Sequence, residues 1–428
     1  MATLLITVPH VTSHILPALP IAEELVKRGH RVLIHTGSRN EDKVRAAGAE
    51  FISMPESCDI VHRLKASSGR IPTWLPLFLR QLLYFRHEIL AMIPGMMAEL
   101  ESLIRQERVD CVIGDYLGFG ASYATEKLGI PYVTLTMSWP VTPNAEGVPL
   151  FVNSLPLPSR MIHGLVNLIF PIGRVRGQMG LSPRPQNAPA EFFAVIVSKM
   201  LNLVTIHQEF IPALPLQENQ VFIGPTASRM PGTSDAPPFG ASLKPGTVLV
   251  STTTSYQRDT GLFGRVLEAV AAMEIPVLAT SSNRKDVPEK LGENVRLETF
   301  VPFDEVLPYV SAIITSGGFG TVGSAFKYGT PILIISDQGG DTLPTALRAT
   351  ELGLAYYLPT NKATPKAIRA KLQALLQDQA LHGRVKALSE QLSSINSPEL
   401  AANAIENLLK NSQTLEEAEV VKGLAVSY

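Results

Sequence analysis

Short apolar runs of strand length alternate with amphipathic segments through the first part of the chain. TLLITV is followed by PALPIAEELVKRG and then by HRVLIHTG, which predicts strand, helix and strand within about 35 residues. The same order recurs in DCVIGD, GASYATEKLG and IPYVTLT, where Gly129 is a helix stop and Pro131 opens the next strand. We therefore predict a doubly wound α/β domain over residues 1–225.

A second domain of the same kind follows a change in composition. Residues 226–246 are rich in Pro, Gly and Ser and predict an interdomain linker. After it the alternation returns in TVLVSTTT, GLFGRVLEAVAAM, IPVLATSS, NVRLETFV, VSAIITS, GTVGSAFKYG and TPILIISD. Continuous apolar runs of this kind are typical of parallel strands that are buried on both faces. We predict a C-terminal domain over residues 247–411 and a tail without a core pattern over residues 412–428.

Composition and charge exclude several classes of protein. Hydrophobic residues make up 45% of the 428 residues and charged residues 18%, which excludes global disorder. The formal net charge of -1 provides no bulk field for nucleic acid, and we expect no nucleic-acid partner. Cys58 and Cys111 are too few for a disulfide framework and lack metal-ligand spacing, which favours a reducing cytoplasm. The first residues, MATLLITVPH, indicate a buried strand rather than a leader, and we expect no transmembrane segment.

Two apolar stretches fit neither strand alternation nor a simple sheet layer. They cover residues 71–104 and 149–201 and are punctuated by Gly and Pro. They are compatible with the walls of a lipophilic pocket and equally with ordinary core helices. Exposed parts of the same stretches would allow transient contact with membrane lipid. The aromatic candidates for an acceptor pocket are Trp74, Phe78, Phe85 and Trp139.

A glycine-rich stretch, TSGGFGT, stands where a strand is predicted to pass into a helix. Gly318, Gly320 and Gly323 form the pattern GxGxxG, and Asp337 ends the next predicted strand, as in dinucleotide-binding proteins. Glycines allow backbone N–H groups to approach an anion, and the helix N-terminus adds partial positive charge. The stretch therefore predicts a phosphate site, with tight helix–sheet packing as the structural alternative.

The surroundings of this stretch argue against a nicotinamide enzyme. The glycines lie in the second domain, late in its strand order, and the helix after them is short. Beyond Asp337 follows QGGDTLPTALRATELG, a polar loop that leads into another helix. That extra loop indicates recognition of something beyond the phosphates.

The span from Thr315 to Gly353 resembles the donor-binding signature of the inverting UDP-glycosyltransferase superfamily, in particular its bacterial members that glycosylate natural products. The family pattern is HGGxGT, then a helix ending in Gly, a strand beginning with Pro, and an acidic residue followed by Gln. The matching positions are Gly317, Gly318, Gly320, Thr321, Gly329, Pro331 and Asp341. VLVSTTTSYQ, VFIGP and FVPFDEVLPYVSAIIT resemble further family segments in the same order. The resemblance implies the GT-B architecture, in which two Rossmann-like doubly wound domains face each other across an interdomain cleft.

The resemblance also implies a catalytic base. The family places a histidine in the loop after the first strand, in a pattern close to GHxxP, and the corresponding stretch here is SHILP. His14 is therefore the expected base, with Ser13 in place of the usual glycine, although His10 lies nearby. The expected carboxylate partner is Asp115, at the end of DCVIGD. A histidine can take a proton near neutral pH, and a carboxylate stabilises the imidazolium that results.

The donor side departs from the family pattern at three positions. Ser316 replaces the frequent His, Phe303 replaces a Gln, and Thr342 replaces the Gln after the acidic residue. These changes predict weaker or altered recognition of the donor. The candidate phosphate-binding residues are Ser316, Gly317, Gly318, Gly320, Thr321, Thr253, Thr254 and Ser255. The candidates for the base and the sugar are Val301, Phe303, Asp341 and Thr342.

Three hypotheses about function follow. The first is an inverting glycosyltransferase that moves a sugar from a UDP- or dTDP-linked donor to a hydroxyl of a lipophilic small molecule. It needs no metal and no cofactor besides the nucleotide sugar, and we expect a monomer or a homodimer. The second is a catalytically silent relative that acts as an activator or scaffold. The third is a nicotinamide-dependent oxidoreductase, which rests on the GxGxxG pattern and Asp337.

Overall fold

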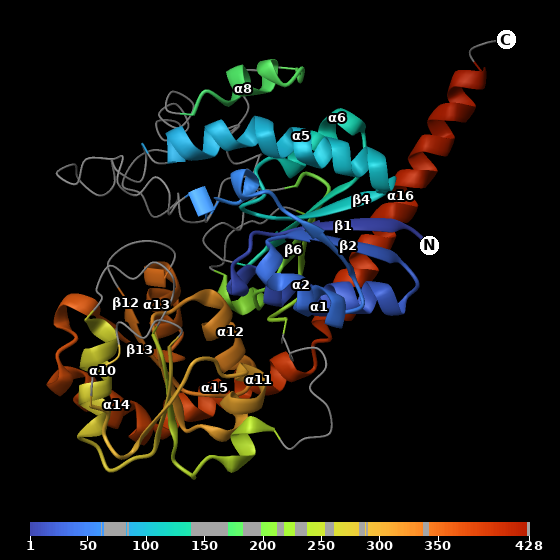
Figure 1. Ribbon diagram of the computed structural model, residues 1–428. Coiled ribbons are helices and arrows are strands. Elements are labelled where there is room, and N and C mark those ends of the chain that lie inside the picture. The colour runs from blue at the N-terminus through green and yellow to red at the C-terminus, as the bar shows by residue number, and fades with distance from the viewer. Residues whose placement is uncertain are drawn as a thin grey trace.

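The structure is a computed structural model. It describes residues 1–60, 62–63, 83, 85–137, 170–182, 198–211, 218–226, 238–252, 261–281, 287, 290–336 and 342–425, except for the side chains of Phe85 and of residues beyond 412. Figure 1 shows two lobes, with the N-terminal half above the C-terminal half in this view. Each lobe is built around one parallel sheet. No helix in the described residues has both the length and the apolar character needed to cross a membrane.

The N-terminal sheet has seven parallel strands in the order β3-β2-β1-β4-β5-β6-β7. Central strands such as β4 are fully buried, so their sequences read as continuous apolar runs. The bounds are β1 Thr3–Thr7, β2 Arg31–Thr36, β3 Glu50–Ser53, β4 Cys111–Asp115, β5 Tyr132–Thr136, β6 Leu201–Val204 and β7 Gln220–Phe222.

Helices cover both faces of this sheet. On one face α1 (Thr12–Lys27), α2 (Glu41–Ala46) and part of α16 (Ser397–Ala425) bury apolar side chains in a common core. On the other face the core contains side chains of α5 (Leu90–Glu107), α6 (Ala121–Leu128) and α8 (Ile172–Gln178). Short helical turns are η1 Ser38–Asn40, η2 Glu56–Cys58, η3 Phe85–Ile89 and η6 Gln208–Phe210.

The C-terminal sheet has six parallel strands in the order β10-β9-β8-β11-β12-β13. The strands are β8 Val248–Ser251, β9 Val277–Thr280, β10 Val295–Glu298, β11 Ala312–Thr315, β12 Ile332–Ser336 and β13 Ala355–Pro359. The helices are α10 Leu262–Ala271, α11 Phe303–Val306, α12 Phe319–Lys327, α13 Thr342–Glu351, α14 Pro365–Gln377 and α15 Gln379–Ser393. The turns η7 Phe239–Ser242, η9 Leu307–Tyr309 and η10 Thr360–Lys362 complete this half. The two doubly wound parallel sheets predicted from the sequence are confirmed.

Several segment boundaries differ from those predicted from the sequence. The first helix begins at Thr12 rather than near Pro17, with Pro17 and Pro20 inside it, so His14 lies in the first helical turn and not in a loop. The predicted tail, residues 412–428, continues as helix α16 as far as Ala425. Residues 227–237 of the predicted linker fall outside the described residues. Its last part contacts the C-terminal half, since the backbone N–H of Phe239 donates to Glu305 Oε2 over 2.9 Å.

The end of the chain returns to the N-terminal half. Ala401, Ala402, Ile405 and Leu409 of α16 belong to the core that also contains the buried side chains of α1. This helix falls within the range predicted for the C-terminal domain, 247–411, so its last part completes the other domain's core. In Figure 1 it is the red helix that runs from the lower lobe along the upper one.

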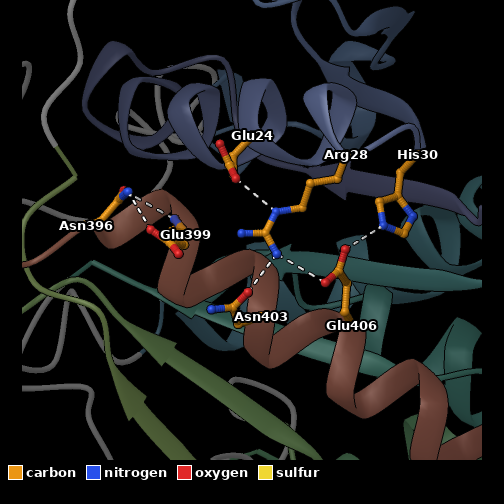
Figure 2. A network of polar contacts seen from close by, with 7 residues as sticks. All are labelled: Glu24, Arg28, His30, Asn396, Glu399, Asn403 and Glu406. Carbon is orange, nitrogen blue, oxygen red and sulfur yellow. Dashed lines mark hydrogen bonds and ion pairs between the residues drawn. The ribbon is translucent and has the colours of Figure 1, made fainter.

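A network of hydrogen bonds and ion pairs joins the end of α1 to α16 (Figure 2). Arg28 donates to Glu24 Oε1 over 2.8 Å, to Asn403 Oδ1 over 2.7 Å and to Glu406 Oε2 over 3.1 Å. His30 Nε2 lies 3.1 Å from Glu406 Oε1, and the bond from His30 is the main reason why the pKa of Glu406 is lowered. The network adds polar specificity to a contact whose apolar part is already buried.

Histidine 35 makes the stability of the fold sensitive to acid. Its side chain is fully buried on β2, with Nδ1 3.1 Å from the Thr7 hydroxyl and no partner for Nε2 among the described residues. Burial lowers its pKa from 6.5 to about 4, against an opposing effect of the Asp59 charge. Below pH 6.5 the unfolded chain therefore binds a proton that the folded chain does not, and stability falls as the pH falls.

We expect the free energy of unfolding to decrease by about 2 kcal/mol between pH 7 and pH 5 on account of this one group. Urea unfolding at the two pH values, with wild type and His35→Gln compared, measures it. The variant should lose less stability than wild type over the same interval. An equal loss in both proteins would show that other groups cause the acid sensitivity.

Candidate functional site

The predicted base and its carboxylate partner meet at the carboxyl edge of the N-terminal sheet. His14 lies in the first turn of α1, directly after β1, and Asp115 is the last residue of the neighbouring strand β4. His14 Nδ1 and Asp115 Oδ2 are 2.8 Å apart, although the residues are 101 positions apart in sequence. The bond places the proton on Nδ1 and the lone pair on Nε2, the tautomer that a general base requires.

The carboxylate of Asp115 is buried and oriented from both sides. Its side chain has no exposed surface, whereas that of His14 is 14% exposed. Oδ1 accepts a 2.7 Å hydrogen bond from the backbone N–H of Leu117, while Oδ2 faces His14. The Tyr116 ring lies 5.6 Å from the His14 ring between centroids. Because both oxygens are engaged, the imidazole can turn little without breaking a charge-assisted bond.

The competing histidine belongs to a separate pair. His10 lies in the turn between β1 and α1, and its Nδ1 is 2.5 Å from Asp59 Oδ2. The backbone N–H of His10 donates to the same oxygen over 2.9 Å, and its carbonyl accepts a 3.1 Å bond from the Asn40 amide. Asp59 therefore holds both the backbone and the ring of His10, which ties this turn to the chain beyond β3.

A small pocket opens at the same edge of the sheet. Backbone and side chains of the turn after β1 form one wall, and the turn that follows Asp115 forms another. Cys58 of η2 and Met96 of α5 add apolar side chains, and most of the lining residues are apolar. The lining residues are Thr7, Val8, Pro9, Met54, Cys58, Ile60, Met96, Leu117 and Gly118. His14 and Asp115 are not among these residues, and Leu117 is the lining residue next in sequence to the pair.

The glycine stretch forms the turn between β11 and α12. Gly317 has a φ of +85°, and a Cβ at this position would lie only 2.6 Å from Cγ2 of Ile334 on the neighbouring strand. Gly318 precedes the first helical residue, and no side chain caps the N-terminus of α12. The first N–H groups of this helix are therefore left without a side-chain acceptor, which suits an anion.

The two other glycines of the pattern differ from each other. A Cβ on Gly320 would meet nothing within 4 Å, so this face of the first turn is open. A Cβ on Gly323 would lie 3.4 Å from the ring of Pro225, which is an ordinary van der Waals contact. Gly323 therefore faces the chain between the two halves, whereas Gly320 faces open space.

The remaining donor candidates are only partly described. Thr342 begins α13, and its carbonyl oxygen would lie 3.5 Å from a Cβ on Gly317, so the phosphate turn and the start of α13 are neighbours. Val301 is 3% exposed, and Phe303 begins α11 and packs against the C-terminal core. Ser316 is buried at the end of β11 and lies next to Gly317. The predicted residues Thr253, Thr254, Ser255, Asp341, Trp74, Phe78 and Trp139, as well as the side chain of Phe85, lie outside the described part of the structure.

Comparisons with known proteins concern the fold and the kind of enzyme. Residues 264–408 match the family model described as the C-terminal domain of erythromycin biosynthesis protein CIII-like proteins. The NDP-glycosyltransferase YjiC of Bacillus subtilis (strain 168) is 24% identical over 412 residues, which cover 93% of this chain and 95% of that protein. The crystal structure of the calicheamicin glycosyltransferase CalG4 superposes with a TM-score of 0.72 at 23% identity, over 96% of this chain and 98% of that one. Over nearly its whole length the chain is thus similar to glycosyltransferases, in line with the predicted resemblance to the UDP-glycosyltransferase superfamily.

The fold of this glycosyltransferase is GT-B, as predicted. A further structure of that fold, glycosyltransferase VinC in complex with dTDP, superposes with a TM-score of 0.67 at 19% identity, over 96% of this chain and the whole of the other. The nicotinamide-dependent alternative is wrong, because the chain is a glycosyltransferase.

Sequence reasoning missed two polar side chains near the candidate site of the glycosyltransferase. Asp59 follows a short turn and carries no motif, yet it binds His10. Arg348 on α13 donates to backbone carbonyls of the N-terminal half, which no local pattern could indicate. In the described residues no group of three or more His, Cys, Asp or Glu side chains is arranged to hold a metal ion.

Proposed function

We propose that this glycosyltransferase moves a sugar from a UDP- or dTDP-linked donor to a hydroxyl of a lipophilic small molecule, with inversion at the anomeric carbon and without a metal ion. The observation that carries the proposal is the 2.8 Å bond between His14 Nδ1 and Asp115 Oδ2 at the carboxyl edge of the sheet. Ligands of open α/β sheets bind at this edge.

The dyad supports a one-step displacement. The acceptor hydroxyl would give its proton to His14 Nε2 while its oxygen attacks the anomeric carbon, and Asp115 would stabilise the imidazolium. The bond from the anomeric carbon to the phosphate oxygen would break at the same time, and the nucleoside diphosphate would leave with its electron pair. Attack from the face opposite the leaving group inverts the configuration of that carbon.

The glycine turn supports a nucleotide-linked donor. The leaving diphosphate gains negative charge as the bond breaks, and the uncapped N-terminus of α12 offers backbone N–H groups and a partial positive charge. The Thr342 carbonyl neighbours this turn, so Thr342 would face the sugar, and Asp341 is the further contact predicted from the sequence. The dTDP complex of VinC favours a thymidine or uridine diphosphate at this place.

The acceptor side is supported by apolar surface. The small pocket at the same edge of the sheet is lined chiefly by Val8, Pro9, Met54, Ile60 and Met96. Small-molecule sites are mostly apolar with few polar groups, and the relative CalG4 is named for a natural product. We therefore favour a lipophilic secondary metabolite as the acceptor. The cytoplasmic location, the transient contact with lipid and the monomer or homodimer remain predictions.

Ser316 provides a test of the donor assignment. Ser316→His restores the residue that the family usually has and adds a donor able to carry positive charge at the phosphate turn. Since a charge-assisted hydrogen bond is about 1 kcal/mol stronger than a neutral one, the Kd for UDP or dTDP should fall roughly fivefold. Titration calorimetry measures it, with Ser316→Ala as the variant that removes the hydroxyl. A higher Kd in Ser316→His would contradict this placement of the phosphate.

The proposed function is tested by a donor and acceptor screen. Purified protein is incubated with UDP- and dTDP-sugars and a panel of phenols and aliphatic alcohols, with and without EDTA, and products are identified by mass spectrometry. The proposal expects glycosylated product, insensitivity to EDTA, and inverted configuration in the proton spectrum of the product. Calorimetry with UDP and dTDP accompanies the screen. Absence of both product and nucleotide binding would favour the catalytically silent scaffold.

A further inference from the structure

A short segment of the N-terminal half enters the core of the C-terminal half. Strand β6 belongs to the N-terminal sheet, but the chain after it leaves that sheet. Val204, Ile206, Phe210 and Ile211 are buried in the same core as the strands and helices of the C-terminal sheet. We call residues Gln208–Ile211, which contain the turn η6, the η6 segment. In Figure 1, β6 lies in the upper lobe and α12 in the lower lobe, both close to where the two lobes meet.

The first contact of the η6 segment is with the phosphate turn. The Phe210 ring lies 5.6 Å from the Phe319 ring between centroids, in an edge-to-face arrangement with an angle of 72°. Its centroid is also 5.9 Å from that of Phe326. Phe319 is the middle residue of GGFGT and the first residue of α12. Both ends of α12 therefore touch one aromatic side chain of the other half.

The second contact is with the helix that follows the predicted sugar contact. Arg348 on α13 donates to the carbonyl of Phe210 over 2.9 Å, of Glu209 over 3.2 Å and of Ile211 over 3.4 Å. These carbonyls end a helical turn, where no intrahelical donor reaches them, and a cation is favourable there. The Arg348 side chain is 14% exposed; its bonds to Phe210 and Ile211 are partly buried, and its bond to Glu209 is exposed.

The η6 segment is also tied to the base. β6 is joined to β1 through the hydrogen-bonded order β1-β4-β5-β6. Asp115 ends β4, and His14, in the first turn of α1, is bonded to it. One sheet therefore holds the partner of the candidate base and, a few residues beyond β6, the segment that touches α12 and α13. Thr342 at the start of α13 neighbours Gly317, so both donor elements are held at one place.

We propose that the η6 segment sets the distance and angle between the donor sugar and His14, and that Phe210 and Arg348 are positioning residues for the transfer. The proposal rests on the proposed function. Displacement requires the acceptor oxygen to lie within about 3–3.5 Å of the anomeric carbon while it also reaches the base. A displacement of about 1 Å far from the reacting atoms can lower the rate of such a step by as much as 100-fold.

The test uses full-length Arg348→Gln and Phe210→Leu. The probes are UDP-glucose and dTDP-glucose as donors and 4-methylumbelliferone as a phenolic acceptor. We expect kcat for transfer to fall 10- to 100-fold, and the Kd for UDP or dTDP to change by less than threefold, because the phosphate turn itself is intact. Hydrolysis of the donor by water should rise relative to transfer, because water does not depend on the placement of an acceptor.

Matched variants separate positioning from general damage. Arg384→Gln removes a 2.9 Å bond from an arginine to the Gly353 carbonyl that stays within the C-terminal half. Glu351→Gln removes the ion pair of Arg348, 2.9 Å long, without touching the carbonyl contacts. Phe263→Leu shortens a phenylalanine of the same core that belongs to α10. Each should change the ratio of transfer to hydrolysis less than twofold.

Two results would overturn the inference. One is an equal fall of transfer and hydrolysis together with a matching rise in the nucleotide Kd, which would mean that Phe210 and Arg348 only maintain the donor pocket. The other is an unchanged single unfolding transition of Arg348→Gln in scanning calorimetry without ligand. The proposal expects the single transition of wild type to separate into two in this variant. If wild type transfers no sugar, the proposed function fails. The calorimetric result alone then decides whether the η6 segment couples the two halves. Separation would support coupling by the η6 segment, and an unchanged single transition would refute it.

Discussion

His14→Ala should lower kcat for sugar transfer by about 10²- to 10⁴-fold, the usual contribution of a positioned general base. The Kd for UDP or dTDP should hardly change, since His14 lies in α1 of the N-terminal half and the phosphate turn precedes α12 of the C-terminal half. Initial rates by mass spectrometry and calorimetric titration of the nucleotide measure the two quantities.

Two further variants test whether the loss of activity is specific to the pair of His14 and Asp115. Asp115→Asn keeps the shape of the partner but can donate to Nδ1 instead of accepting from it, so it should also lower kcat strongly while folding is retained. His10→Ala is the matched control, because it removes another imidazole paired with a buried aspartate in the same turn. If His10→Ala cost as much as His14→Ala, the base would have been assigned to the wrong histidine.

Gly317→Ala should have the second largest effect and should act on both stability and donor binding. A φ of +85° costs an L-residue about 1–2 kcal/mol, and the new methyl group would lie 2.6 Å from a methyl of Ile334, which is fully buried and has no room to move. We expect the free energy of unfolding to fall by about 2 kcal/mol or more. The Kd for UDP or dTDP should rise at least about tenfold, since relief of the clash moves the turn.

Two other glycines provide the comparison. Gly383→Ala lies inside helix α15 with nothing within 4 Å of the added methyl, and it should stabilise the protein by up to about 1 kcal/mol. Gly320→Ala also meets nothing in the protein, so it should weaken nucleotide binding without a loss of stability. Chemical unfolding and calorimetric titration measure all three. Unchanged nucleotide affinity in both Gly317→Ala and Gly320→Ala would contradict the assignment of the phosphate site to this turn.

Much of the fold could be predicted because of burial. Strands β1, β4, β8, β11 and β12 are covered on both faces, so each appears in the sequence as an uninterrupted apolar run. The edge strand β3 is short and partly exposed, and its sequence EFIS carries no such signal. The first helix was placed too late because proline usually marks a helix start. In the structure the turn before Pro17 closes through bonds from His14 and Ile15 to the Val11 carbonyl.

The residues of the candidate site could be predicted only where a local sequence pattern indicates them. The pairing of His14 with Asp115 could be anticipated because both follow predicted parallel strands and both match the family pattern. Asp59 and Arg348 could not, since their partners are backbone groups or a turn residue far away in sequence. Contacts of that kind depend on how the two halves pack, and neither periodicity nor a motif encodes that packing.

The crossing of α16 has a consequence for biosynthesis. The N-terminal sheet and its first helices leave the ribosome early, yet Ala401, Ala402, Ile405 and Leu409 complete their core. Until those residues emerge, the surface of α1 that they cover remains open to water and to chaperones. The N-terminal domain is therefore translated first, but its core is completed only when the end of the chain has been synthesised. Nascent chains stalled before residue 397 should bind chaperones that the released protein does not bind.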